Sequence, residues 1–341
     1  MAKQCPLTNI VCSAEEHPRV HSVYMHANCL MDLLMGRRGK MTEEKLIQII
    51  RSGYGQGHGD AYRPFLKNTR AAISKQGTQS SAKVLYGFNR SCDFKSRQEK
   101  NIARALLWLG ASDIREQFPI WPWPHHHPLL GTPGAEKLVL APAPGLIEIA
   151  EEANIFHGVY IGTNLPYVAT IDFMVTVYTN KIPRLVAIAC KDREVVLDVE
   201  GSFRPRERLE LERRYCARLY IPHLIVDREV FGNTLLANLA WLMPDEQVVA
   251  DLTKDQQIGS FFSLINKEIF KIAIDEAVDQ AGATVGWTPK RALSAFRYFA
   301  WTPTFDIDLT KPVLMTQPAT PGGARIHQLL QKRILGEIDD G

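Results

Sequence analysis

The chain has 341 residues, of which 45% are apolar and 23% are charged. These are ordinary globular proportions, which argue against a disordered chain, a collagen or a coiled-coil rod, and at roughly 150 residues per domain the length predicts about two domains. The 6 scattered cysteines are too few for the framework of a disulfide-rich secreted domain. The net charge of +3, from 40 basic and 37 acidic residues, does not by itself indicate a nucleic-acid partner.

The N-terminal region carries charges and histidines where a signal peptide would be apolar. No apolar run approaches the roughly 20 residues that a membrane-spanning helix needs, so we expect a cytoplasmic protein without a membrane partner. Residues 1–40 lack sustained periodicity, and we interpret them as an N-terminal extension that is disordered or omitted by initiation at Met41. The cysteines and histidines of this extension lack the paired C-x-x-C spacing of zinc modules.

A regular pattern begins after Met41, where Thr42 is a candidate N-cap for a short amphipathic helix. The glycine-rich segment 53–59 ends that helix. Residues 36–76 hold nine basic side chains against three acidic ones, which favours a polyanionic partner. Because glycine lets the backbone approach a phosphate closely, we predict DNA binding in this region. The predicted DNA contacts here are Gly57, His58, Arg63 and Lys67.

The middle of the chain predicts an α/β unit. Ser96 and Glu99 have the S-x-x-E spacing of a capping box at the start of a helix. A proline-rich, loop-like stretch follows at residues 119–145, and we interpret its three consecutive histidines, residues 125–127, as an exposed loop. The elements expected next are strands at 171–178 and 184–191, a charged helix at 206–220 and a strand at 221–227. This order predicts a mixed sheet.

The C-terminal third of the chain has a mostly helical pattern. An apolar stripe at 262–273 predicts one helix, and Thr288-Pro289 opens a second helix with a threonine cap and a proline in its first turn. An extended, hairpin-like segment is expected at 305–313, and this combination favours a winged-helix-like module. Arg291 on the second helix is a further predicted DNA contact, for which a solvated basic helix face is an equally good explanation.

Glu99, Asp172 and Lys191 give the strongest chemical signal. Asp172 and Lys191 fall at corresponding ends of two strands joined by a short turn, where neighbouring strands lie about 4.8 Å apart, so their side chains can meet. Two carboxylates are suitable ligands for Mg²⁺, and a lysine beside the ion could position or activate an attacking water. The structural alternatives are a capping-box role for Glu99, a solvated strand-end acid at Asp172 and an edge lysine at Lys191.

Three ordered segments of the chain resemble the TnsA family of transposon endonucleases. They are GQGHG with YRPFL at residues 55–66, DIREQFP at residues 113–119, and LELERRY with Ile221-Pro222 at residues 209–222. The resemblance is best over residues 41–242. It implies an α/β fold with a restriction-endonuclease-like mixed-sheet core at residues 41–231, followed by a winged-helix-like domain at residues 232–341.

The resemblance also implies an activity and a set of partners. TnsA proteins cut the 5′ strands at transposon ends with Mg²⁺, for which Mn²⁺ can substitute, together with a TnsB-type transposase and a TnsC-type ATPase. Such a protein acts in the bacterial cytoplasm at the nucleoid, and a stand-alone restriction or repair nuclease fits the three segments less well. By position, Glu99 and Asp172 match the metal ligands and Lys191 the catalytic lysine. Glu212 matches a helix glutamate, for which an ion pair with a neighbouring arginine is the structural alternative.

The chain departs from the family pattern two residues before Lys191. The family carries a glutamine there, or a glutamate in related nucleases, that helps to bind the metal, whereas this chain has Ala189. Alanine supplies no side-chain oxygen, so we expect one metal ligand to come from water or from the backbone carbonyl of Cys190. We therefore predict weaker metal binding, and we retain as the alternative a catalytically weak subunit that binds DNA and assembles the transposase complex.

Overall fold

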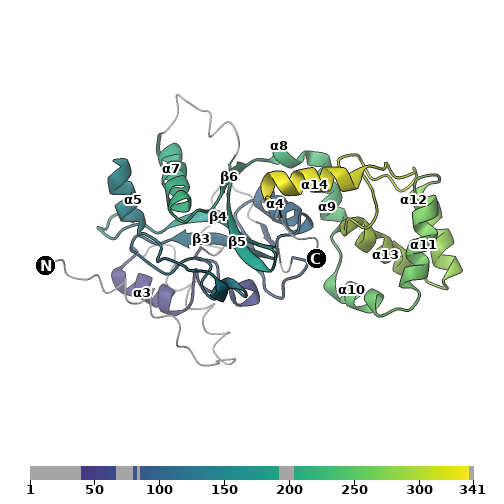
Figure 1. Cartoon of the computed structure of the whole chain (residues 1–341), viewed down its shortest axis with the longest axis horizontal. Coiled ribbons are helices and arrows are strands. Elements are labelled where there is room, and N and C mark those ends of the chain that lie inside the picture. The colour runs from purple at the N-terminus through teal and green to yellow at the C-terminus, as the bar shows by residue number, and fades with distance from the viewer. Residues whose placement is uncertain (1–39, 67–79, 83–84, 192–202, 338–341) are drawn as a thin grey trace.

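The computed structural model describes residues 40–66, 80–82, 85–191 and 203–337 (Figure 1). A four-stranded sheet of order β3-β4-β5-β6 lies at the centre of the N-terminal part. Its strands are β3 (Asp113–Ile120), β4 (Ala169–Thr179), β5 (Ile182–Cys190) and β6 (His223–Val226). The first three run antiparallel, and β6 runs parallel to β5. The predicted mixed sheet is therefore confirmed, and the predicted extension at residues 1–40 lies, apart from Lys40, outside the described residues.

Helices cover both faces of this sheet, as the alternation of side chains along β4 requires. Phe173 and Val175 pack with Ile102 of α4 (Arg97–Trp108) in one apolar cluster. Met174, between them, belongs to a second cluster that includes Tyr215 of α7 and residues of α5. The other elements of this part are α3 (Glu43–Arg51), β1 (Ser80–Ala82), β2 (Cys92–Phe94), α5 (Leu146–Ala153) and α7 (Phe203–Arg218), with short 3₁₀ turns at Gly59–Ala61 and Ala135–Lys137.

Two predicted helix caps are present. Thr42 Oγ1 accepts a hydrogen bond from the backbone N–H of Lys45 at 3.3 Å, and Ser96 Oγ accepts one from that of Glu99 at 3.0 Å. The Glu99 carboxylate, however, accepts from the N–H of Lys95 at 2.9 Å, one residue before the cap that a reciprocal capping box would use. Glu99 thus only partly plays the capping role that its spacing predicts.

A tight hairpin turn sets the register of β4 and β5. Asn180 and Lys181 both have positive φ, 52° and 60°, as in the two-residue turns that match the twist of a hairpin. The register runs from Thr179 opposite Ile182 to Phe173 opposite Ile188. This pairing brings the start of β4 beside the end of β5, where the predicted site residues lie.

The three consecutive histidines do not form the exposed loop that we predicted. His125 is 3% exposed, and its Nε2 lies 2.9 Å from the hydroxyl oxygen of Tyr215 on α7. Burial lowers the pKa of His125 to about 4, so the ring is neutral at pH 7. Tyr215 is distant in sequence, and no local pattern predicts this contact. His125 therefore belongs to the core that holds α7 in place.

The C-terminal part is helical and folds back on the sheet region (Figure 1). Its helices are α8 (Arg228–Phe231), α9 (Asn233–Leu242), α10 (Glu246–Thr253), α11 (Ile258–Glu268), α12 (Ile274–Thr284), α13 (Pro289–Trp301) and α14 (Gly323–Ile334). The predicted Thr288 cap of α13 is confirmed, with Thr288 Oγ1 accepting from Arg291 N at 3.3 Å. Helix α11 ends at Glu268, before the end of the apolar stripe that predicted it.

No β-strand forms among the described residues beyond β6; the predicted extended segment at 305–313 makes a single isolated bridge, Ile307 to Pro321. The helical character is confirmed, but the hairpin expected of a winged helix is not formed there. None of the helices in the described ranges has the length and apolarity needed to cross a bilayer.

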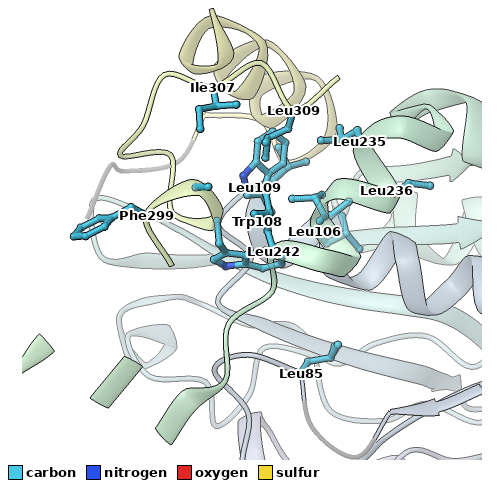
Figure 2. Packing of buried hydrophobic residues seen from close by; sticks show 14 of the residues in the cluster. Leu85, Leu106, Trp108, Leu109, Leu235, Leu236, Leu242, Phe299, Ile307 and Leu309 are labelled. Atoms are coloured by element: carbon cyan, nitrogen blue, oxygen red, sulfur yellow. The ribbon is translucent and has the colours of Figure 1, made fainter. Parts of the chain in front are cut away.

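One apolar cluster joins the C-terminal helices to the sheet region. Figure 2 shows Trp108 and Leu109, at the end of α4, beside Leu235 of α9 and Leu309. His327 of α14 adds a polar contact, since its Nε2 lies 2.9 Å from the carbonyl oxygen of Trp108. The helix that carries Glu99 at its beginning is therefore anchored at its end by the C-terminal part.

Candidate active site

Asp172 and Lys191 meet at the end of the two central strands, where β4 begins and β5 ends. Lys191 Nζ donates to Asp172 Oδ2 at 2.6 Å, and the N–H of Cys190 donates to the same oxygen at 2.8 Å. Asp172 is only 6% exposed, which distinguishes it from a solvated strand-end acid. Lys191 Nζ also lies 3.3 Å from the carbonyl oxygen of Cys190, so that carbonyl faces the same space.

Glu99 approaches this pair from the first turn of α4. It is 7% exposed, and burial, followed by the negative charge of Asp172, raises its pKa to about 7. The charges of Lys95 and Lys191 and the hydrogen bond from the Lys95 backbone act in the opposite direction and lower the pKa of Glu99. The structure thus brings together Glu99, Asp172 and Lys191, which are far apart in the sequence.

Lys191 remains a cation in this environment. Burial lowers its pKa, but the charge of Asp172 and the hydrogen bond to it raise the pKa by more, and the net result lies above the usual value. A lysine that stays protonated at neutral pH donates hydrogen bonds and stabilises negative charge, and it does not accept a proton from water. The sequence left two roles open for Lys191, positioning or activating the attacking water, and its protonated state favours positioning.

Glu212 of α7 lines the same cavity, which has a volume of about 200 Å³ and is also lined by Asp172 and Lys191. Its side chain is 10% exposed and lies 3.5 Å from Nε2 of His223, and burial raises its pKa. The arginines that follow it on the helix pair instead with Glu210. The alternative of an arginine ion pair for Glu212 is therefore wrong in this structure.

The oxygen atoms at this end of β4 and β5 suit a hard cation that is held by few protein ligands. Two carboxylates and the Cys190 carbonyl offer oxygen ligands, and Mg²⁺ commonly takes one or two carboxylates and completes its shell with water and phosphate. Within the described ranges, no three His, Cys, Asp or Glu side chains form a metal-binding group. Two carboxylates and a carbonyl oxygen are the kind of donors that Mg²⁺ takes, whereas a closed zinc site has no counterpart among the described residues.

Ala189 lies beside this site on β5. It is fully buried, and its Cα pairs with that of Ile225 on β6. Continuing the β4–β5 register by one residue places Ala189 opposite Asp172. The methyl group offers no oxygen, as the sequence indicates, so any further protein ligand must come from another strand or helix.

The glycine-rich segment lies elsewhere, and its residues make contacts within the protein. Gly57 has φ of 90°, and a Cβ there would lie 2.7 Å from the carbonyl oxygen of Ala61, so glycine is needed for the turn itself. His58 Nε2 lies 2.6 Å from the carbonyl oxygen of Leu130. Arg63 donates to the carbonyl oxygen of Ser52 at 2.8 Å. None of these residues lines the cavity of Asp172 and Lys191.

The other predicted DNA contacts are not at the cavity either. Arg291 forms an ion pair with Asp255 at 2.5 Å, and its guanidinium lies over the ring of Trp287 at 5.1 Å from the centroid. Lys67 lies outside the described residues. The assignments of Gly57, His58, Arg63, Lys67 and Arg291 to DNA binding thus stay predictions, without support from proximity to the acids.

A buried ion pair explains why two of the three family-like segments occur together. Arg90 donates to both oxygens of Glu116 on β3, at 2.7 and 2.8 Å, and to the carbonyl oxygen of Gly59 at 3.0 Å. Gly59 N in turn donates to Asp113 Oδ2 at 2.9 Å, and the Tyr62 hydroxyl donates to the carbonyl oxygen of Glu116. The glycine-rich loop is therefore locked to the strand that carries the DIREQFP segment.

Sequence reasoning missed a group of basic and aromatic residues at the mouth of the site. Arg208 and Tyr167 line both the cavity of Asp172 and a neighbouring one of about 570 Å³. The Arg208 guanidinium lies 5.8 Å from the centre of the Tyr167 ring. Arg204, one helical turn earlier on α7, and Lys40 also line the second cavity. The arginines at i and i+4 were a signal for one basic helix face, but they could not be placed beside Asp172 without the fold.

Comparison with known proteins agrees with the three segments. No protein-family model matches the chain. The transposon Tn7 transposition protein TnsA of Escherichia coli is 28% identical to it over 214 residues, which cover 62% of this chain and 67% of that protein. The predicted resemblance is thereby confirmed at the level of distant homology. The chain is a distant homologue of TnsA over 62% of its length.

Proposed function

We propose that the chain is a Mg²⁺-dependent DNA endonuclease that cuts the 5′ strands at transposon ends, acting with a TnsB-type transposase and a TnsC-type ATPase. The observation that carries this proposal is the ion pair between Lys191 and Asp172 in one partly buried cavity, with Glu99 of α4 near enough for the charge of Asp172 to raise its pKa. Homology to a transposition protein supports the biological setting. The basic and aromatic residues at the cavity mouth support a nucleic-acid substrate.

Each residue has a distinct role in this proposal. Glu99 and Asp172 hold the cation together with the carbonyl oxygen of Cys190, and the two hydrogen bonds that Asp172 Oδ2 accepts fix the orientation of its carboxylate. A Mg²⁺ ion held by these residues would supply positive charge to polarise the scissile phosphate. Lys191 donates a hydrogen bond towards the attacking water or the charge that develops on the phosphate. Glu212 borders the same space and adds negative charge beside Lys191.

A second candidate function is that of a catalytically weak subunit that binds DNA and assembles the transposase complex. The alanine at position 189, where the family has a metal ligand, favours it. A subunit without this ligand can retain DNA binding and complex assembly while cutting slowly. The two functions differ in a measurable way, because the first requires strand breakage and the second does not.

The test is a reconstituted cleavage reaction. Transposon-end DNA labelled on each 5′ strand is incubated with this protein, the TnsB-type and TnsC-type partners and Mg²⁺. We expect cutting of the 5′ strand that requires all three proteins and stops when EDTA is added. DNA binding without 5′ cutting would favour the assembly function, and cutting by this protein alone would contradict the dependence on partners.

A second prediction concerns Arg208. Because its side chain lies between the acids and the neighbouring basic cavity, Arg208→Ala is expected to weaken DNA binding several-fold and to lower the salt dependence of binding by about one phosphate contact. Fluorescence anisotropy over a series of salt concentrations measures both quantities. Arg213→Ala is the matched control, since Arg213 lies on the same helix, pairs with Glu210 and lines neither cavity. Equal losses in the two variants would contradict a specific role for Arg208.

A further inference from the structure

Gln117 of β3 is a buried polar residue beside the candidate site, and the proposed roles do not use it. The ladder between β3 and β4 pairs Glu116 with Phe173 and Phe118 with Ile171. Gln117 therefore lies at the level of Asp172, between these two pairs. It is fully buried and has φ of 50°, in the left-handed region that non-glycine residues seldom adopt within a strand.

The amide of Gln117 links the two elements that carry the acids. Its Nε2 lies 3.5 Å from Glu99 Oε2 on α4, and its Oε1 accepts from the hydroxyl of Thr170 on β4 at 3.3 Å. Thr170 also lines the cavity of Asp172 and Lys191. A strained backbone costs on the order of 1–3 kcal/mol and is retained mainly at sites where a particular side-chain position is required. The position that this strain preserves is next to Glu99.

The amide can present either of its ends to the acids. A glutamine carries a carbonyl oxygen and an NH₂ group, and a hydroxyl such as that of Thr170 can both donate and accept. If the amide turns over, the NH₂ group donates to Thr170 and the carbonyl oxygen faces the side of Glu99. An amide oxygen is a suitable ligand for a hard divalent cation. Ala189 on β5 cannot provide such an oxygen. Gln117 on β3 therefore has the ligand oxygen that β5 lacks.

We propose that Gln117 completes the divalent-cation site by contributing its amide oxygen beside Glu99 and Asp172. This inference rests on the proposed metal-dependent function. It assigns the missing protein ligand to β3, on the side of β4 opposite to β5. The left-handed backbone at Gln117 is then the feature that turns the amide out of the regular strand pattern and towards Glu99.

The test measures Mn²⁺ binding to the full chain by isothermal titration calorimetry, without DNA or partners. Gln117→Asn shortens the side chain by one methylene group but tolerates positive φ. It is expected to weaken Mn²⁺ binding by about tenfold or more, as loss of a contact at a metal site commonly does. Gln117→Glu keeps the length and supplies an oxygen, so it is expected to retain or tighten binding. Thermal unfolding in EDTA checks that both variants fold.

The outcomes separate this inference from the proposed function. If the unmodified chain binds no Mn²⁺, the metal-dependent function itself fails and Gln117 fails with it. If Asp172→Asn abolishes binding but Gln117→Asn binds as tightly as the unmodified chain, only the role of Gln117 is overturned. Loss of binding in both Gln117 variants would show that the position is structural, and this also overturns the inference.

Discussion

Asp172→Asn is expected to lower 5′-strand cutting by about a thousandfold in the reconstituted reaction, because a metal-holding carboxylate contributes several kcal/mol to stabilising the transition state. Asparagine keeps the size of the side chain and its capacity to accept from the N–H of Cys190. It removes the negative charge that faces Lys191 and that the cation requires. The rate of appearance of the cut 5′ strand, measured with saturating partners, gives the effect directly.

Two measurements make this result specific. Asp227→Asn is the matched control, since Asp227 caps α8 and asparagine is an equally good cap, so cutting should be unchanged. DNA binding by Asp172→Asn should stay close to that of the unmodified chain, because the basic residues at the cavity mouth remain. If Asp172→Asn cuts at the original rate, the active site lies elsewhere in the chain.

Arg90→Ala is expected to lower the free energy of unfolding by about 3–5 kcal/mol, the usual result of leaving one partner of a buried ion pair uncompensated. The side chains of Arg90 and Glu116 are 8% and 0% exposed, and they hold each other through two hydrogen bonds. Burial lowers the pKa of Arg90, but the hydrogen bond and charge of Glu116 raise it by more, so Arg90 stays charged. Urea denaturation at pH 7, followed by circular dichroism, measures the change.

The control for this prediction is an exposed ion pair. Arg213→Ala removes a partner of Glu210 at the surface of α7, where solvent screens such pairs, so the free energy of unfolding should change little. The double variant Arg90→Met, Glu116→Leu should recover part of the loss, because it leaves no buried charge unpaired. A loss below about 1 kcal/mol in Arg90→Ala would show that this pair does not fix the glycine-rich loop to β3.

Local signals in the sequence were sufficient for the elements that carry the site. The caps at Ser96 and Thr288, the turn at residues 179–181 and the strand at 171–178 are each set by neighbouring residues, so they could be predicted. The meeting of Asp172 with Lys191 followed from that turn, because a hairpin fixes which strand ends are adjacent. The approach of Glu99 needed the family resemblance, since nothing local places α4 over the end of the sheet.

Strand β3 shows why the rest could not be predicted. Its sequence is Asp-Ile-Arg-Glu-Gln-Phe-Pro-Ile, with one polar residue at the start and three consecutive polar residues from Arg115 to Gln117. Every residue of the strand is nevertheless buried. The alternation of polar and apolar residues that identifies a half-buried strand is therefore absent. The carboxylate of Glu116 is satisfied by Arg90, and Asp113 Oδ2 accepts from Gly59 N; both partners belong to other segments. Gln117 escaped notice for the same reason, because its partners are on α4 and β4.

The closing contact of α14 with α4 also sets an order of events during synthesis. The carbonyl oxygens of Trp108 and Leu109, at the end of α4, receive hydrogen bonds from His327 and Gln331, which follow them by 219 and 222 residues. Helix ends with unsatisfied carbonyls fray, so the helix that presents Glu99 stays incompletely fixed until the ribosome has delivered the last helix. A chain truncated before α14 would then lack the two contacts that fix the end of the helix bearing Glu99.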